Sequence, residues 1–420
     1  MDFKEHLKKY LSSEFIDDLI ASFSLNEHKG LFINTRKISD DEFIKKFPAL
    51  HKHPIVPHCY LYNKDEFDAG KNIYHELGLY YIQDPSASLV PYFLNPKGKG
   101  QILDMCAAPG GKSIMTSLLC DEEGIIYAND ISSSRVQHLL SNIERLGISN
   151  IVVLNKDLSK IKNLENRFDA IILDAPCSGS GMFRRSEEMK NDWSYEKVTR
   201  LSKIQKELIL LAYSFLKEGG KLIYSTCSYS YEEDEEVVFH LLKNSDAKLL
   251  PLPENDMFYR SKEMKEAIHL FPNRFVGEGH FIALITKPGE LISEIKKEEK
   301  QIIRKSQGKG TSSINNYFKL FYKAYDDLIN ISIRPGLFVK SEISNKMIYS
   351  HHYSHYIDDK SSIHVSLSDA KKYILGEEIN IDDDKEYHFI AYEKYNISST
   401  QNRLKKLKNL YPKGLRKQIN

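Results

Sequence analysis

Along the middle of the chain, short apolar runs alternate with longer segments in which apolar residues recur at helical spacing. The runs, among them "QILD", "IIYAN" and "NIVVL", have the length of buried strands. The segments between them, such as "SSRVQHLLSNIERLG", place apolar residues on one helical face. Between residues 76 and 288 this alternation predicts β-α-β units and an α/β fold with a parallel sheet covered by helices. Ligands of such sheets bind at the carboxyl ends of the strands.

The pattern changes on both sides of this predicted core, 76–288. Residues 1–75 combine helical periodicity, as in "FIDDLIASF", with short apolar pieces broken by turns, which predicts a small α/β N-terminal module. Residues 289–313 are charged and then rich in Gly and Ser, which is typical of a linker. Residues 314–420 contain several short β-like runs. We therefore expect a β-rich C-terminal domain after the linker.

Composition narrows the class of protein. A chain of 420 residues is too long for one ordinary core, which favours two or three domains. No apolar run approaches the length of a membrane span, and the N-terminal segment is too charged for a signal peptide, so we expect a cytoplasmic protein with no membrane partner. The five cysteines form no CxxC pair, which argues against disulfides and structural zinc, and no metal is expected.

A glycine-rich turn, "LDMCAAPGGKS", follows the first strand of the predicted sheet and opens a helix. Glycine lets the backbone approach a ligand, and the helix N-terminus offers unpaired N–H groups. The spacing differs from G-x-G-x-x-G, so the nicotinamide fingerprint is absent. Asp130 ends the second strand, where an acid can accept hydrogen bonds from ribose hydroxyls, and Asp157 ends the third, where it can meet an adenine amino group. These positions predict an adenosine-containing cofactor; the alternative is that both acids merely cap helices.

Two cysteines follow strands of the same sheet. Cys177 lies in "LDAPCSGSG", three residues after Asp174, and Cys227 lies in "LIYSTCS". Buried cysteines are often inert, but small polar neighbours surround both of these. Cys106 and Cys120, by contrast, are expected to pack in the core, the first beneath the cofactor turn. Covalent chemistry at Cys177 and Cys227 is therefore the favoured interpretation.

Several motifs in sequence order resemble the Sun-type RNA cytosine-5 methyltransferases: "DMCAAPGGK", "YAND", "DAPCSGSGMFR", "STCS" and "EEDEEVV". The resemblance covers residues 75–288 closely and implies a Rossmann-like core that uses S-adenosyl-L-methionine. The whole layout, including the terminal "YPKGLR", is similar to that of bacterial ribosomal RNA members of this family. It implies an RNA-binding N-terminal module, a C-terminal PUA-like RNA-binding domain and 16S ribosomal RNA or the 30S subunit as partner of a monomeric enzyme. Transfer RNA is the alternative substrate, and a non-catalytic RNA-binding ribosome assembly factor is the alternative function.

The resemblance also assigns residue roles. It implies that Cys227 attacks carbon 6 of cytosine, that Cys177 assists product release, and that Asp174 bonds the cytosine edge near Lys112. DNA cytosine-5 enzymes use the cysteine of the "PC" motif as nucleophile, so the reverse assignment stays open. The implied cofactor pocket comprises Cys106, Ala107, Ala108, Pro109, Gly110, Gly111, Lys112, Asp130, Arg135, Asp157 and Asp174.

Three features lie outside the motifs. The family often has an Arg-x-Asn-Thr stretch in its N-terminal module, but here Phe32 stands at the arginine position and Arg36 is displaced. Seven basic residues between Arg403 and Lys417 are expected to contact phosphates. In "HHYSH" two histidines lie one helical turn apart, but no third ligand is near, which disfavours a metal site.

Overall fold

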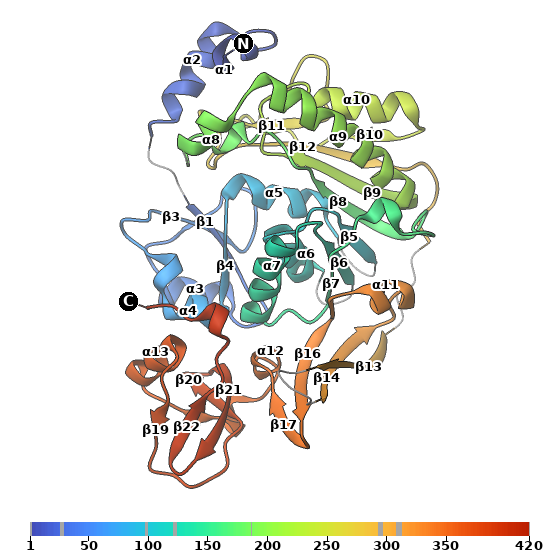
Figure 1. The fold of residues 1–420 in the computed structure, drawn as a ribbon. Helices are drawn as coiled ribbons and strands as arrows, with labels where there is room; N and C mark the ends of the chain where they lie inside the picture. Colours follow the sequence, from blue (N-terminus) through green and yellow to red (C-terminus); the bar gives the residue numbers. More distant parts are fainter. Residues whose placement is uncertain are drawn as a thin grey trace.

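The computed structural model describes residues 2–25, 29–96, 100–120, 124–185, 187–292, 297–307 and 313–419. Figure 1 shows the N-terminal helices at one end, a central sheet between helices, and two smaller sheets at the other end. No helix in these described ranges is long and apolar enough to cross a membrane.

The N-terminal region contributes a four-stranded sheet in the order β2-β3-β1-β4. Its strand β1 is antiparallel to both neighbours and buries four of its five residues, because elements cover both of its faces. Helices α1 and α2 instead join an apolar cluster with Tyr229 and Phe271 of the core. The elements are α1 (Phe3–Leu7), α2 (Ser13–Ser22), β1 (Lys29–Ile33), α3 (Asp40–Lys46), β2 (His51–Lys52), β3 (Cys59–Tyr62), α4 (Ile73–Glu76) and β4 (Tyr80–Gln83).

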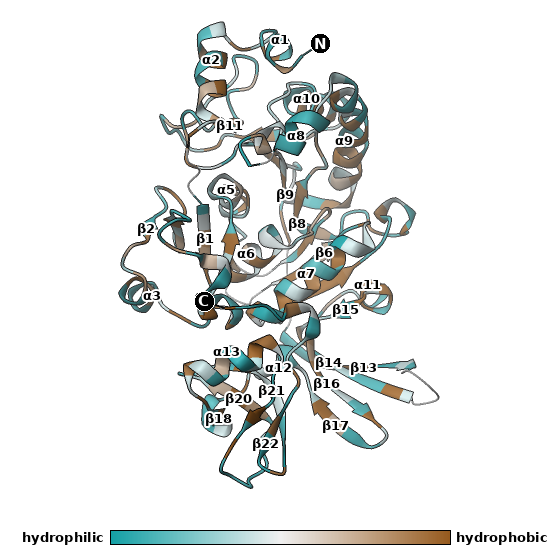
Figure 2. Cartoon of the chain, turned by 60° about the vertical axis from the view of Figure 1, so that its left-hand side comes forward, coloured by the Kyte–Doolittle hydropathy of each residue, from teal (hydrophilic) through white to brown (hydrophobic). Residues whose placement is uncertain are grey.

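The core is the predicted Rossmann-like sheet, and the structure confirms it. Five parallel strands run in the order β9-β8-β5-β6-β7, and β12 adds antiparallel to β9. Every residue of β6 and β7 is buried, as expected of parallel strands covered on both faces. The central strands are mostly apolar in Figure 2. The strands are β5 (Gln101–Asp104), β6 (Ile125–Asn129), β7 (Ile151–Leu154), β8 (Phe168–Asp174), β9 (Leu216–Thr226), β10 (Lys248–Leu250), β11 (Ile268–Leu270) and β12 (His280–Thr286).

Helices flank this sheet on both faces (Figure 1). Serine side chains cap α7 and α9 at their N-termini, and Gly147 ends α7 in the left-handed conformation. The helices are α5 (Pro85–Leu94), α6 (Gly111–Leu119), α7 (Ser133–Leu146), α8 (Glu187–Asp192), α9 (Tyr195–Phe215) and α10 (Glu235–Asn244).

The C-terminal region forms two sheets rather than one, in the orders β13-β14-β16-β17 and β18-β20-β21-β22-β19. A short strand, β15, returns to the core and pairs with β7. The elements are β13 (Lys297–Gln307), β14 (Ser313–Tyr322), α11 (Asp326–Ile331), β15 (Arg334–Pro335), β16 (Leu337–Ile343), β17 (Lys346–Tyr349), α12 (His351–Ser354), β18 (Ile363–His364), α13 (Leu367–Leu375), β19 (Ile379–Asn380), β20 (Phe389–Tyr392), β21 (Tyr395–Arg403) and β22 (Lys406–Asn409).

The expected linker, 289–313, contains a strand where none was predicted. Lys297–Gln307 forms β13 and pairs along its length with β14. This strand lies at the edge of its sheet and is mostly exposed, so it lacks the apolar alternation by which half-buried strands are predicted. The rest of the range includes 293–296 and 308–312, which lie outside the described residues.

The basic segment Arg403–Lys417 is part of the last sheet and its return to the N-terminal region, rather than a loose tail. Lys406 pairs with Glu378 (3.1 Å) inside the sheet, and Lys417 pairs with Glu76 of α4 (2.7 Å). Tyr411 donates to the same Glu76 carboxylate (2.8 Å). At least two of the seven basic side chains therefore stabilise the fold.

Candidate active site

The glycine-rich turn joins β5 to α6 at the carboxyl edge of the sheet. Gly110 has φ +116°, and a Cβ on it would lie 2.7 Å from a methyl carbon of Leu139, so a side chain is excluded there. A Cβ on Gly111 would lie 2.7 Å from the amide nitrogen of Gln83 and 2.9 Å from a ring carbon of Tyr81. Strand β4 therefore packs directly on the turn.

Asp130 stabilises this turn from the end of β6. One of its carboxylate oxygens accepts a hydrogen bond from the Ala108 amide (3.3 Å) and pairs with Arg135 (3.1 Å). Arg135 also donates to the Ala108 carbonyl oxygen. The structure thus brings Asp130, Arg135 and the turn together, as the motif match implied.

Asp157, at the end of the next strand, is differently placed. It caps the short turn after β7 through the Ser159 amide (3.2 Å) and pairs with Lys160 (3.0 Å). The Ser159 hydroxyl, which donates to the same carboxylate (2.6 Å), and then Lys160 lower the pKa of Asp157. In this structure Asp157 therefore acts as a cap of the turn that follows it. Asn155 donates to the Asp130 carbonyl oxygen (2.7 Å), which ties the ends of β6 and β7 together.

A buried carboxylate beneath the turn fits a bound cofactor. Asp104 accepts a hydrogen bond from Ser113 (2.6 Å) on one oxygen, while the other is buried without a partner among the described residues. Burial raises the pKa of Asp104 to about 7. A buried oxygen without a partner can accept a hydrogen bond from an amine or hydroxyl group of S-adenosylmethionine. The two glycines of the turn leave room for the cofactor beside it, so the residues present fit this group.

Lys112 and Asp174 form an ion pair next to the turn. The ammonium lies 2.7 Å from one carboxylate oxygen of Asp174, and Ser225 donates to the other (2.8 Å). Burial opposes ionisation of Asp174, yet the Lys112 charge holds the pKa of this carboxyl below its usual value. Asp174 is therefore a fixed anion at the end of β8.

Cys177 and Cys227 meet beside this pair although 50 residues separate them. Their Sγ atoms are 3.1 Å apart, well beyond a disulfide bond of about 2.05 Å, so both are free thiols in contact. The contact with Cys227, together with burial, raises the pKa of the Cys177 thiol well above its usual value. Either thiol can donate to the other sulfur across this contact.

Glu233 holds the two cysteine loops, a role the sequence analysis missed. Its fully buried carboxylate accepts from the Ser178 amide (2.8 Å), the Ser228 hydroxyl (2.6 Å) and the Gln205 amide (3.0 Å). Ser178 and Ser228 directly follow the two cysteines. The "EEDEE" run fits favourable charges at a helix N-terminus equally well, so only the fold distinguishes Glu233 from its neighbours.

His280 is a second residue that sequence reasoning missed. It opens β12, and its Nδ1 lies 3.0 Å from the Ser86 hydroxyl. Burial and the Lys112 charge lower the pKa of His280 to about 4, so its ring is neutral near pH 7. With so low a pKa, the His280 ring serves near neutral pH as a hydrogen-bonding group rather than as a base.

The remaining sequence candidates have structural positions. Arg36 donates to the Ser117 carbonyl oxygen (2.6 Å), and Phe32 is buried, so this stretch joins the N-terminal module to the core. Burial raises the pKa of Cys106, and Cys120 lies in an apolar cluster. His351, from "HHYSH", is buried against Tyr411, with ring centroids 5.1 Å apart.

The parallel sheet, the glycine turn beside Asp130, and the residues gathered at its carboxyl edge define the fold of S-adenosylmethionine-dependent methyltransferases. Comparison with known proteins narrows this class. The chain belongs to the RsmB/F family of 16S rRNA methyltransferases, whose family model matches residues 91–286. The N-terminal domain of 16S rRNA methyltransferase RsmF matches residues 1–85, and the RsmF PUA domain matches 360–417. The last match confirms the expected PUA-like fold at the C-terminus.

Two curated relatives illustrate the family. The chain is 36% identical over 299 residues to ribosomal RNA small subunit methyltransferase F of Vibrio vulnificus, which covers 68% of this chain and 63% of the relative. It is 35% identical over 315 residues to tRNA (cytosine(49)-C(5))-methyltransferase of Pyrococcus abyssi, covering 69% of this chain and all of the relative. The chain thus spans less than two thirds of the length of the ribosomal RNA relatives.

Solved structures give the same fold. A methyltransferase homologue from Pyrococcus horikoshii is 30% identical, with a TM-score of 0.57 over 67% of this chain and 98% of that one. NSun6 from the same organism, solved with SFG, is 22% identical, with a TM-score of 0.60 over 69% of this chain and 98% of that one, and shows likeness of fold alone.

Proposed function

We propose that this protein methylates carbon 5 of a cytidine in RNA through a covalent adduct between Cys227 and carbon 6 of the base. The observation that carries the proposal is the contact of two thiols, 3.1 Å apart, at the carboxyl edge of a methyltransferase sheet. Methyl transfer to oxygen or to an exocyclic amine needs no second thiol beside the first. Carbon 5 of cytosine is a poor nucleophile, and a thiolate added to carbon 6 turns the ring into an enamine that can attack a methyl group.

The assignment of Cys227 as nucleophile follows from the charges around it. A thiolate attacks, so the attacking sulfur needs partners that stabilise its negative charge. The Lys112 ammonium is close enough to interact favourably with a thiolate at Cys227. Cys177, whose Sγ lies 3.1 Å from that of Cys227, is then left for the proton-relay role that the family resemblance implies.

The other residues of the site would position the base and complete the reaction. The Asp174 carboxylate, held by Lys112 and Ser225, has lone pairs left to accept a hydrogen bond from the cytosine amino group. The bound cofactor supplies a methyl group on a sulfonium. Once the methyl is transferred, the carbon 5 proton leaves to a base, the electron pair reforms the double bond of the ring, and the Cys227 thiolate is expelled. We propose that the Cys177 relay moves that proton, as the family resemblance implies.

We further propose 16S ribosomal RNA, in the 30S subunit, as the substrate of a monomeric cytoplasmic enzyme. The matches to the RsmF N-terminal and PUA domains support this choice. Transfer RNA is the second candidate, because the tRNA enzyme of Pyrococcus abyssi aligns over its whole length. Bisulfite sequencing of total RNA from cells with and without the gene distinguishes the two substrates. An RNA-binding assembly factor without catalysis would leave both RNA pools unchanged.

Alanine variants of the two cysteines test the covalent step. Cys227→Ala should form no adduct and transfer no methyl. Cys177→Ala should attack and methylate but release the RNA slowly, so a protein–RNA adduct should survive denaturing electrophoresis. Each ~1.4 kcal/mol added to the barrier of elimination slows release about tenfold. Cys120→Ala, which removes a buried thiol at the C-terminal end of α6, is the matched control and should behave as the wild type.

The reverse pattern, with the stable adduct in Cys227→Ala, would assign attack to Cys177. Two active variants without any adduct would refute covalent catalysis.

A further inference from the structure

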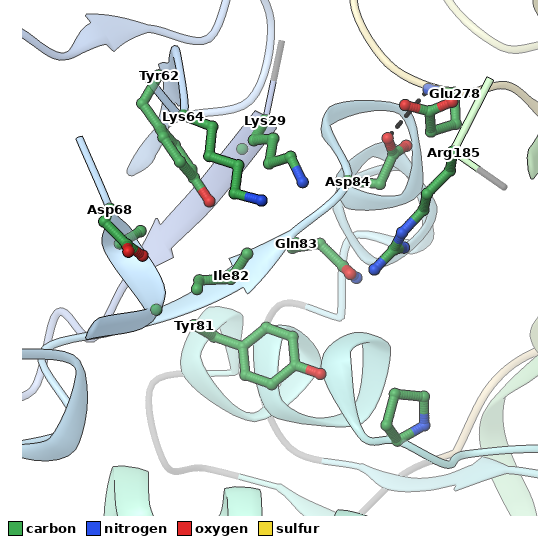
Figure 3. Close-up of a pocket in the computed structure, with 14 residues that line it drawn as sticks. Lys29, Tyr62, Lys64, Asp68, Tyr81, Ile82, Gln83, Asp84, Arg185 and Glu278 are labelled. Atoms are coloured by element: carbon green, nitrogen blue, oxygen red, sulfur yellow. Dashed lines mark hydrogen bonds between the residues drawn. The ribbon is translucent and has the colours of Figure 1, made fainter. Parts of the chain in front are cut away.

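A cavity of about 350 Å³ opens beside the cofactor turn, between the N-terminal sheet and the core. Its walls come from β1, the end of β3 with the segment after it, strand β4, the cofactor turn, and the loops before α8 and β12. The lining residues used below are Lys29, Lys64, Tyr81, Gln83, Pro109 and Arg185. Figure 3 shows the Lys29 and Lys64 amines pointing into the same space, with the Arg185 guanidinium reaching toward Gln83.

Three cationic side chains face this cavity, and the acids that line it have other partners. One oxygen of Asp84 accepts from the Glu278 amide (3.0 Å), and the other accepts from the Ser86 amide (2.9 Å) at the start of α5. Glu278 pairs with Arg184 (3.4 Å). Asp68 caps a turn through the Lys71 amide (3.2 Å).

The Lys64 and Arg185 side chains, by contrast, are exposed at the cavity, and no ion pair of either is found among the described residues. Cations with exposed heads around a cavity favour an anionic ligand.

The cavity borders the cofactor turn of the candidate active site. Pro109 belongs to the cofactor turn itself, and Tyr81 and Gln83 pack on Gly111, the neighbour of Lys112. Burial raises the pKa of Tyr81, and the charges of Arg145, Lys112 and Arg185 all oppose this rise, so the Tyr81 hydroxyl lies within electrostatic reach of both the catalytic pair and the cavity. A strand whose base reaches Asp174 must therefore pass close to the cavity.

We propose that this cavity binds a nucleotide adjacent to the target cytidine, with its phosphodiester held by Lys29, Lys64 and Arg185. The proposal rests on the proposed function. Lysine and arginine are the usual phosphate ligands in RNA-binding grooves, and the Gln83 amide can both donate to and accept from the edge of a base. The volume lies at the lower end of the range for small-ligand pockets, which suits a single nucleotide. A single-stranded, splayed RNA presents such nucleotides one at a time.

The test combines protein variants with RNAs that lack one charge. Short single-stranded RNAs centred on the methylated cytidine carry one uncharged methylphosphonate each, at successive positions around that cytidine. Full-length wild type, Lys64→Ala and Arg185→Ala are compared by steady-state methylation. Lys45→Ala is the matched control, because this exposed lysine of α3 does not line the cavity.

Each cavity variant should raise KM for the unmodified RNA about tenfold, with kcat within about twofold, because phosphate contacts position the strand rather than react. At one methylphosphonate position, the KM of the wild type should also rise about tenfold. The KM of the cavity variants should not rise further at that position, because they already lack the contact. The Lys45→Ala control should follow the wild type throughout.

If each methylphosphonate raised KM by the same factor in the wild type and in the variants, the cavity would hold no phosphate and the inference would be overturned. A wild type that methylates neither these RNAs nor 30S subunits and transfer RNA from cells without the gene would instead overturn the proposed function, and the inference with it.

Discussion

Replacing Glu233 by alanine should loosen both cysteine loops at once. The carboxylate accepts from the loop after Cys177 through Ser178 and from the loop after Cys227 through Ser228. Without it, the buried Ser178 amide loses its acceptor, and the Gln205 amide keeps only its bond to the Pro176 carbonyl oxygen (2.8 Å). The two serine hydroxyls can still bond each other, since their oxygens are 3.3 Å apart.

The magnitude follows from the donors left unpaired. A buried donor without an acceptor costs about 1–3 kcal/mol, so two such donors cost about 2–6 kcal/mol. Removing the carboxylate offsets part of this, because burial raises the pKa of Glu233 and so opposes its charge. We expect the free energy of unfolding to fall by about 2–4 kcal/mol for Glu233→Ala. Glu233→Gln should lose only about 1 kcal/mol, because its carbonyl oxygen can accept from Ser178 while the serine hydroxyls rotate to accept from its amide.

Activity of Glu233→Ala should fall because the two cysteines are misplaced, and not because cofactor binding is weaker. Misplacement of reacting groups by about 1 Å can reduce a rate about a hundredfold, so kcat should drop about that much for Glu233→Ala, with cofactor affinity unchanged. The assays are urea unfolding, calorimetry with S-adenosylmethionine, and methylation of RNA. Glu236→Ala is the matched control, because Glu236 lies at the same helix N-terminus but pairs only at the surface with Lys206 (2.8 Å). If folded Glu233→Ala keeps a kcat within twofold of Glu236→Ala, helix-end charge explains both residues and the positioning role is wrong.

Two further predictions concern the cofactor and pH. Asp130→Ala should weaken S-adenosylmethionine binding by about 1–3 kcal/mol, since its contacts stabilise the turn; unchanged affinity by calorimetry in the folded variant would remove Asp130 from the site. His351 is buried, and burial lowers its pKa from 6.5 to about 4, so the unfolded chain binds the proton more readily and the free energy of unfolding should fall as the pH drops below about 6.5. His351→Phe should reduce the loss between pH 7 and pH 5 by about 2 kcal/mol in denaturant titrations, and an unchanged loss would contradict the assignment.

The sequence by itself determined the local elements and the class of site. Strand and helix periods follow from which side chains are apolar, and a turn that needs glycine is visible as glycine, so the core sheet and the cofactor turn could be predicted. The exposed edge strand Lys297–Gln307 could not, because neither of its faces is buried enough to impose a pattern. The separate sheet it begins was missed for the same reason.

Only the tertiary structure decided which distant residues meet. Cys177 and Cys227 touch because β8 and β9 are neighbours in the sheet, and strand order depends on how the helical crossovers pack rather than on any local pattern. The packing of elements also lets Glu233 reach both cysteine loops. It likewise brings together the cations of the cavity, which come from β1, the segment after β3 and the loop before α8. Local periodicity selects strand or helix, whereas packing of complete elements brings their ends together.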